Sequence, residues 1–162
     1  MTSKEINQNQ QLQDSSIDRE IISVEYGIGR IIRVFKLHDG LDDFFEVEFS
    51  QTNVKNYYPV NSMKKYRFLS TKDRLLEAVD VFKTKHVETE FKSTHEYINH
   101  YKKLFEVKDL AHTAKTLSLL KGKEALNPQL KVLFDRALKS FVLELKYVLN
   151  LTKTQASDLL KI

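Results

Sequence analysis

The chain has 162 residues, which is enough for one ordinary domain or two small ones. Hydrophobic residues make up 41% and charged residues 30%, values that exclude a disordered or fibrous protein. There is no cysteine, which excludes a disulfide framework and a cysteine-based zinc site and favours a reducing compartment. No apolar run approaches the roughly 20 residues of a membrane span, and the first residues lack the layout of a signal peptide. We therefore predict a soluble, cytoplasmic protein.

The excess positive charge of the chain is concentrated in its C-terminal part. The net charge is +4, but residues 1–20 hold two Lys or Arg against four Asp or Glu, and residues 21–70 hold seven against six. Residues 71–162 hold seventeen against twelve, so the local balances are −2, +1 and +5. One interpretation is a polyanionic partner for the C-terminal part. The other is a solvated helical surface that is rich in lysine.

The first sixty residues divide into a polar tail and a run of short strands. Residues 1–18 are rich in Gln, Asn and Ser and hold too few apolar residues to offset the entropy of ordering, which predicts a disordered tail. Beyond it, segments such as Phe44–Phe49 alternate apolar and charged residues, as half-buried strands do. Pro59 cannot donate to a ladder, so the last strand should lie at an edge or end there. Four strands are predicted, at about residues 21–24, 30–37, 44–49 and 54–60, with turns at Gly27-Ile28-Gly29, 38–40 and 51–53.

After residue 70 the hydrophobic period becomes that of helices. A further helix is predicted at about residues 108–120, and the longest, at about 128–149, carries one apolar stripe. The predicted fold class is α+β, with a small antiparallel β-module followed by an all-α domain of five helices. Four helix starts carry a short polar side chain that can accept from the free amides of the first turn. These starts are Ser70 with Asp73, Ser93 with Glu96, Asn127 before Pro128, and Thr152 with Gln155.

The sequence lacks the motifs of catalysis and cofactor binding. It contains no phosphate-binding glycine loop, no GxSxG elbow and no HExxH. Glu96 and His100 would share a helix face, but a third ligand is not evident, so a solvated ion pair is favoured over a metal site. Gly27-Ile28-Gly29 is not a dinucleotide loop because no helix follows it. We predict a protein that is not an enzyme and holds no cofactor and no metal.

Four aromatic residues gather near the ends of the predicted strands, Phe44 and Phe45 on one strand and Tyr57 and Tyr58 on the next. Most of them are interpreted as the core of the sheet, because aromatic residues favour strands. Tyr57 and Tyr58 are adjacent and point to opposite faces, so one of them should be exposed. An exposed aromatic residue on an edge strand is a candidate contact for a partner.

Three stretches of the chain together resemble a known family. The first comprises SVEYGIGRIIRV (residues 23–34), FFEVEF, YYPV and then Tyr66-Arg67 ahead of a helix. The second is YINHYKKLFEVKDLAHTAKTLSLL (residues 97–120). The third is LNPQLKVLFDRALKSFVLEL (residues 126–145), which includes Lys131, Ala137 and the Glu144-Leu145 pair. In their order and spacing, over about residues 20–160, these stretches resemble the CarD family of RNA polymerase-binding regulators.

The resemblance implies two different functions for the two parts. Residues 19–69 would form a Tudor-like domain, shared with the transcription-repair coupling factor, that binds the β subunit of RNA polymerase by pairing sheet edges. Residues 70–162 would form a helical domain that contacts double-stranded promoter DNA and stabilises the open complex. The polymerase-facing positions of the family map near Lys36 and Tyr57, and Arg33 and Lys55 are candidates by strand position. We expect a monomer with these two partners and no membrane contact.

The chain departs from the family where the DNA contact is expected. Family members generally carry a tryptophan wedge and two basic residues before and at the start of the second helix. This chain has no tryptophan, Ser93 takes the wedge position, and the basic pair is replaced by His95 and Glu96. A serine cannot unstack a base step; Phe91 is the candidate substitute, or else it packs on the helical core. Phosphate contacts alone predict weak, salt-sensitive, non-specific binding. The candidate DNA-binding residues are Phe91, Lys92, Ser93, Lys102, Lys103, Lys121, Lys123, Lys131 and Arg136.

Two other functions remain open from the sequence. One is a non-specific DNA-binding protein that needs no polymerase, in which residues 71–162 would hold the full DNA affinity. The other is an adaptor whose helical domain binds a protein, which the loss of the wedge and of the basic pair favours.

Overall fold

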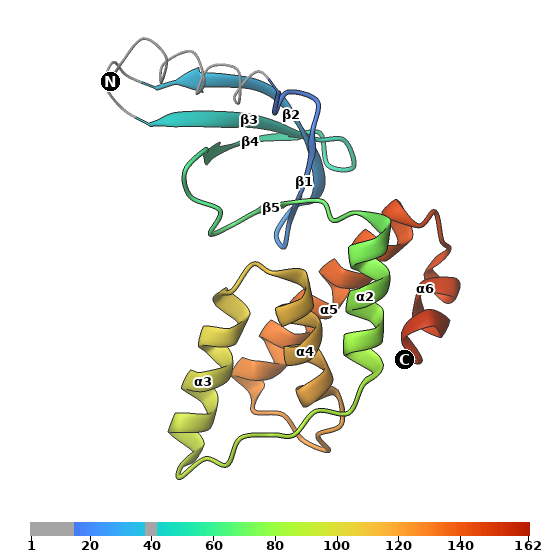
Figure 1. Ribbon diagram of the computed structural model, residues 1–162. Coiled ribbons are helices and arrows are strands. Elements are labelled where there is room, and N and C mark those ends of the chain that lie inside the picture. The colour runs from blue at the N-terminus through green and yellow to red at the C-terminus, as the bar shows by residue number, and fades with distance from the viewer. Residues whose placement is uncertain (1–14, 38–41) are drawn as a thin grey trace. The chain divides into compact units, whose positions relative to one another are not determined.

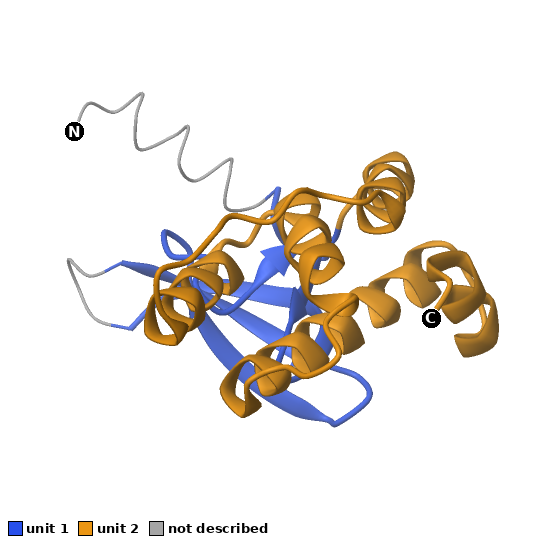
Figure 2. Cartoon of the chain, turned by 90° about the horizontal axis from the view of Figure 1, so that it is seen from below, with its two compact units in different colours: residues 1–69 blue, residues 70–162 orange. Residues whose placement is uncertain are grey.

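The computed structural model describes residues 15–37 and 42–162. The turn predicted at residues 38–40 and the first fourteen residues of the predicted tail lie outside this range. The chain divides into two compact units, Met1–Leu69 and Ser70–Ile162 (Figure 2). The first unit holds an antiparallel sheet and the second holds helices (Figure 1). The fold is therefore of the α+β class, as the sequence predicts.

The sheet of the first unit is antiparallel and has the strand order β4-β3-β2-β1-β5. Its outer strands are β4 and β5. The prediction that Pro59 ends a strand or lies at an edge is confirmed, because it is the last residue of the outer strand β4. The sequence did not predict β5, which is only two residues long. The strands are β1 (Glu20–Ser23), β2 (Gly27–Lys36), β3 (Asp43–Phe49), β4 (Val54–Pro59) and β5 (Arg67–Phe68).

The turn between β1 and β2 lies earlier than the glycines suggest. Residues 24–26 form the turn, and Gly27 opens β2 with a φ of 81°. Gly29, predicted to be part of the turn, lies inside β2, where an added Cβ would stand 2.6 Å from Cγ1 of Val47 and 2.7 Å from Cδ1 of Phe49. The prediction of a turn at all three residues was wrong, because Gly29 is there for close packing rather than for a turn.

The predicted disordered tail is also too long at its C-terminal end. The amide of Asp18 donates to the carbonyl of Ile31 at 2.8 Å, and the amide of Ile31 donates to the carbonyl of Arg19 at 3.0 Å. Ser16 is buried. Asp18 and Arg19 are thus held against β2 by main-chain hydrogen bonds, which the polar composition of the segment does not reveal.

A β-bulge in β2 determines which side chains face the core of the sheet. Ile31 pairs with Val47 and Arg33 pairs with Glu46, so one extra residue of β2 is inserted between them. As a result Ile31 is fully buried while Arg33, two residues later, faces outward. The core of this unit consists of Ile21, Ile31, Phe45, Val47, Phe49, Tyr58 and Tyr66.

The second unit contains five helices within the described residues, as predicted. Three of the predicted N-caps are confirmed: Ser93, Asn127 and Thr152 each accept from an amide of the first turn. The fourth was wrong, since Thr71 and not Ser70 accepts from the amide of Arg74. No helix of residues 15–37 and 42–162 is both long and apolar enough to cross a membrane. The helices are α2 (Lys72–Lys83), α3 (Thr94–Glu106), α4 (Leu110–Lys121), α5 (Pro128–Val148) and α6 (Lys153–Leu160).

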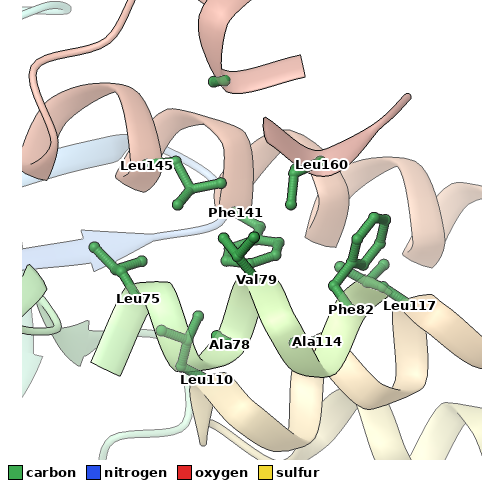
Figure 3. Packing of buried hydrophobic residues seen from close by; sticks show 11 residues of the cluster. Leu75, Ala78, Val79, Phe82, Leu110, Ala114, Leu117, Phe141, Leu145 and Leu160 are labelled. Atoms are coloured by element: carbon green, nitrogen blue, oxygen red, sulfur yellow. The ribbon is translucent and has the colours of Figure 1, made fainter. Parts of the chain in front are cut away.

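The main core of the helical unit is formed by α2, α4, α5 and α6, whose apolar side chains point toward one another (Figure 3). Phe82 of α2 and Phe141 of α5 meet with ring centroids 6.1 Å apart. A second cluster, around Tyr101, Leu120 and Leu130, packs α3 against α4 and α5. The apolar stripe predicted for the longest helix therefore serves both clusters.

Candidate interaction surfaces

Three of the four residues predicted to bind polymerase lie together on the face of the sheet that is turned away from its core. Glu46 on β3 pairs with Arg33 on the neighbouring strand β2 and with Tyr57 on the other neighbouring strand, β4. Nε of Arg33 lies 2.7 Å from Oε2 of Glu46, and Nζ of Lys55 lies 3.9 Å from Oε1 of the same carboxylate. The Arg33 and Lys55 side chains are 60% and 51% exposed, whereas the Glu46 side chain is 9% exposed. Arg33 and Lys55 are thus the accessible groups around the nearly buried Glu46, while the exposed Glu48 lies opposite Lys55 two residues further along β3.

Three aromatic rings extend this face toward the end of the strands. The ring centroid of Phe35 lies 5.3 Å from that of Tyr57 and 6.3 Å from that of Phe44. The guanidinium of Arg33 stands 4.9 Å from the centroid of Phe35. Tyr57 is 49% exposed, while Tyr58 on the opposite face is buried in the core, so the predicted exposed tyrosine is Tyr57. We call Phe35, Phe44 and Tyr57 the aromatic trio, and the trio with Arg33, Glu46 and Lys55 the outward face.

The fourth predicted residue, Lys36, is placed differently. Successive residues of a strand alternate between faces, so Lys36 lies on the side opposite to Phe35. Its Nζ lies 3.9 Å from Oδ1 of Asp43, its partner in the register. The structure therefore does not bring Lys36 together with Arg33, Lys55 and Tyr57.

The outer edge of β4 offers few free main-chain groups. The amide of Val60 donates to the carbonyl of Asp43, so the ladder to β3 uses every second residue and leaves residues 55, 57 and 59 directed away from it. The amide of Tyr57 donates to Oδ1 of Asn56 at 2.9 Å. Pro59 has no amide hydrogen, and its carbonyl accepts from the hydroxyl of Tyr66 at 3.0 Å. Of residues 55, 57 and 59, only Lys55 has an amide that makes no hydrogen bond within the part of the chain that the structure describes.

In the helical unit, both residues considered for the wedge are used within the fold. Phe91 is half-buried and packs against Tyr97 and His100, with ring centroids 5.3 and 5.0 Å apart. The hydroxyl of Ser93 accepts from the amide of Glu96 at 3.1 Å and caps α3. The structure therefore matches the alternative in which Phe91 packs on the helical core.

Three of the predicted DNA-binding lysines have acceptors within the chain. Nζ of Lys121 donates to the carbonyl of Phe82 at 2.7 Å, and desolvation by burial lowers the pKa of Lys121 below its usual value. Lys123 forms an ion pair with Glu88. Nζ of Lys131 lies 2.6 Å from Oδ1 of Asp135 one turn further along α5. A phosphate would have to compete with these partners.

The remaining predicted DNA-binding residues are more accessible. Lys92, Lys103 and Arg136 are exposed, and Lys102 is half-buried. They come from the α2–α3 connection, from α3 and from α5. Exposed lysine and arginine side chains of this kind can reach phosphate oxygens but do not read bases.

Glu96 and His100 each have partners close by in the chain. Oε2 of Glu96 accepts from the amide of Lys92 at 2.9 Å, and the His100 ring packs on Phe91 and Tyr101. In the part of the chain that the structure describes, no three His, Asp or Glu side chains gather as a metal site would require.

Phe35, Phe44 and Glu46 complete the outward face and were not among the polymerase-binding residues predicted from the sequence. Their alternation with Val34 and Phe45 was visible, but the face they occupy depends on the bulge and on the strand register.

Comparisons with models of protein families and with curated proteins found no match to the chain.

Proposed function

We propose that the chain is a bacterial, cytoplasmic transcription regulator. In this proposal residues 19–69 bind the β subunit of RNA polymerase, and residues 70–162 contact promoter DNA and stabilise the open complex. The observation that carries the polymerase contact is the grouping of Arg33, Lys55 and Tyr57 on one exposed face of the sheet. Arg33 comes from β2, and Lys55 and Tyr57 come from β4.

The DNA contact of this proposal rests on charge rather than on shape. Residues 71–162 carry seventeen Lys or Arg against twelve Asp or Glu. Lys92, Lys103 and Arg136 are exposed and can meet phosphates. Because no apolar wedge is free at Phe91 or Ser93, binding should be weak and should not select a sequence.

Binding of the full-length chain to the purified β-subunit lobe and to core polymerase tests the first contact. We expect a complex at micromolar concentrations, and the absence of any complex would refute the polymerase contact. A promoter duplex titrated at rising salt tests the second contact. Affinity should fall steeply between about 50 and about 200 mM salt, and affinity that is independent of salt would contradict a phosphate contact.

A protein-interaction adaptor is the second candidate function. It is favoured by the internal partners of Lys121, Lys123 and Lys131, which leave fewer basic groups for phosphate than the sequence suggests. An adaptor would bind polymerase but would show no salt-dependent affinity for the promoter duplex. The same two titrations therefore separate it from the first proposal.

A further inference from the structure

The geometry points to the outward face of the sheet, rather than the outer edge of β4, as the surface on which the protein partner of this unit docks. It also points to the chemistry of the partner segment, which should bring an apolar side chain to the aromatic trio and a carboxylate to Arg33 and Lys55. This inference rests on the proposed binding of polymerase and concerns how that contact is made.

Main-chain pairing along β4 would be short. A strand that adds to a sheet edge needs a row of alternating amides and carbonyls. At Tyr57 the amide already donates to Asn56, and at Pro59 there is no amide to offer and the carbonyl accepts from Tyr66. Native proteins protect sheet edges with proline and with local capping of this kind. The edge of β4 has the features of a protected edge.

The aromatic trio, in contrast, has the features of an interaction anchor. Its three rings come from β2, β3 and β4 and hold one another in place with centroids 5.3 and 6.3 Å apart. Aromatic rings fixed in this way lose little entropy on binding, which is why such residues often dominate interface energies. Tyr57 is half-exposed, so a partner can still bury a large part of its surface.

The accessible charge beside the trio selects an acidic partner. Arg33 and Lys55 share the carboxylate of Glu46, which is nearly buried, while most of both cationic side chains faces solvent. The other carboxylate on this face, Glu48, is exposed and lies in register with Arg30 on β2 and with Lys55 on β4. The cation nearest to the trio is Arg33, whose guanidinium stands 4.9 Å from the ring centroid of Phe35 and whose side chain is largely exposed. A partner carboxylate that approaches the trio from the Arg33 side would satisfy this cation best.

Three variants of the full-length chain, titrated against the purified β-subunit lobe, test the inference. Tyr57→Thr removes one ring of the trio and keeps a residue that suits a strand. Lys55→Met removes the cation and keeps an apolar side chain of similar length. Asn56→Thr releases the amide of Tyr57 and so restores a donor to the edge without touching the outward face. Circular dichroism of each variant establishes that it is folded.

Docking on the face predicts an affinity loss of about tenfold or more for Tyr57→Thr. It predicts a loss of a few-fold for Lys55→Met, with a weaker dependence on salt, and an unchanged affinity for Asn56→Thr. Stronger binding of Asn56→Thr together with unchanged binding of Tyr57→Thr would show edge pairing and overturn the inference, while the proposed function would stand. Loss of DNA affinity alone in Tyr57→Thr would make the face a nucleic-acid surface and would also overturn it. Absence of binding by the unmodified chain would refute the polymerase contact and this inference together.

Discussion

The backbone amide of Ser70 donates a 2.8 Å hydrogen bond to Oε1 of Glu144, which lies 74 residues further along the chain. Ser70 is the first residue of the helical unit, and Glu144 on α5 is completely buried. The bond fastens the segment that leads into α2 to the C-terminal part of the longest helix. It also accounts for the helix start, because Ser70 is held at this point and the next residue, Thr71, provides the cap.

Replacement of Glu144 should destabilise the helical unit. Glu144→Ala removes the acceptor of the Ser70 amide and leaves a space in a packed region, so we expect a loss of about 2 kcal/mol or more in the free energy of unfolding. Glu144→Gln keeps a carbonyl oxygen at the same position and should cost clearly less. Urea denaturation followed by the helical signal in circular dichroism measures both, and equal losses in the two variants would contradict a role for the hydrogen bond.

Gly29 should not tolerate a side chain. The Cβ of Gly29→Ala would stand within 2.6 to 2.8 Å of Val47 and Phe49, inside the sheet core, so we expect a loss of roughly 1–3 kcal/mol. Gly122→Ala is the matched control, because no atom lies within 4 Å of the added Cβ and its φ of −89° suits any residue. Near-ultraviolet circular dichroism follows unfolding, since four of the seven tyrosines lie in the first unit. A similar stability of the two variants would refute the close packing at Gly29.

The stability of the sheet should fall in alkaline solution because of Tyr66. Tyr66 is 2% exposed, and desolvation by burial raises its pKa from the usual value of 10.0 to about 12. Between these two values the unfolded chain releases the proton while the folded chain keeps it, so the free energy of unfolding falls as the pH rises. The contribution is fully present below pH 10 and amounts to roughly 2.7 kcal/mol at most, at about 1.4 kcal/mol per unit.

Urea denaturation between about pH 8 and about pH 11.5 measures this effect. Tyr66→Phe should be less stable at neutral pH by about 1 kcal/mol, because the hydrogen bond to the carbonyl of Pro59 is lost. Its stability should nevertheless depend less on alkaline pH. An equally steep decline in Tyr66→Phe would assign the effect to other groups, such as Tyr58, whose pKa is also raised by burial.

Lys121 and Lys103 should respond in opposite ways to the same substitution. Lys121 donates to the carbonyl of Phe82 and stands 4.2 Å from the centroid of its ring, so Lys121→Met should lower the stability of the helical unit and leave DNA affinity nearly unchanged. Lys103 is exposed, so Lys103→Met should leave stability unchanged within about 0.5 kcal/mol. It should also reduce the salt slope of DNA binding by about one phosphate contact.

Fluorescence anisotropy with a labelled duplex, together with thermal unfolding, measures both variants. A loss of DNA affinity in Lys121→Met with unchanged stability would mean that Lys121 leaves Phe82 to contact phosphate. Equal DNA affinity of Lys103→Met and the unmodified chain would remove Lys103 from the DNA surface.

The sequence by itself determined those features that depend on near neighbours. The change from a two-residue to a helical period distinguished the strands from the helices, because each period reflects the geometry of one element. The caps at Ser93, Asn127 and Thr152 were predictable for the same reason, since each accepts from an amide two or three residues away.

Only the tertiary structure decided which polar groups are accessible and which are already paired. The bulge in β2 turns Arg33 outward, and the register of three strands places Glu46 beneath Arg33 and Lys55. Lys121 and Lys103 are both lysines in the last turn of a helix. Lys121 nevertheless donates to a carbonyl 39 residues away, whereas Lys103 faces solvent. The physical reason is the same in each case: a hydrogen bond or ion pair between distant residues depends on packing that no local pattern encodes.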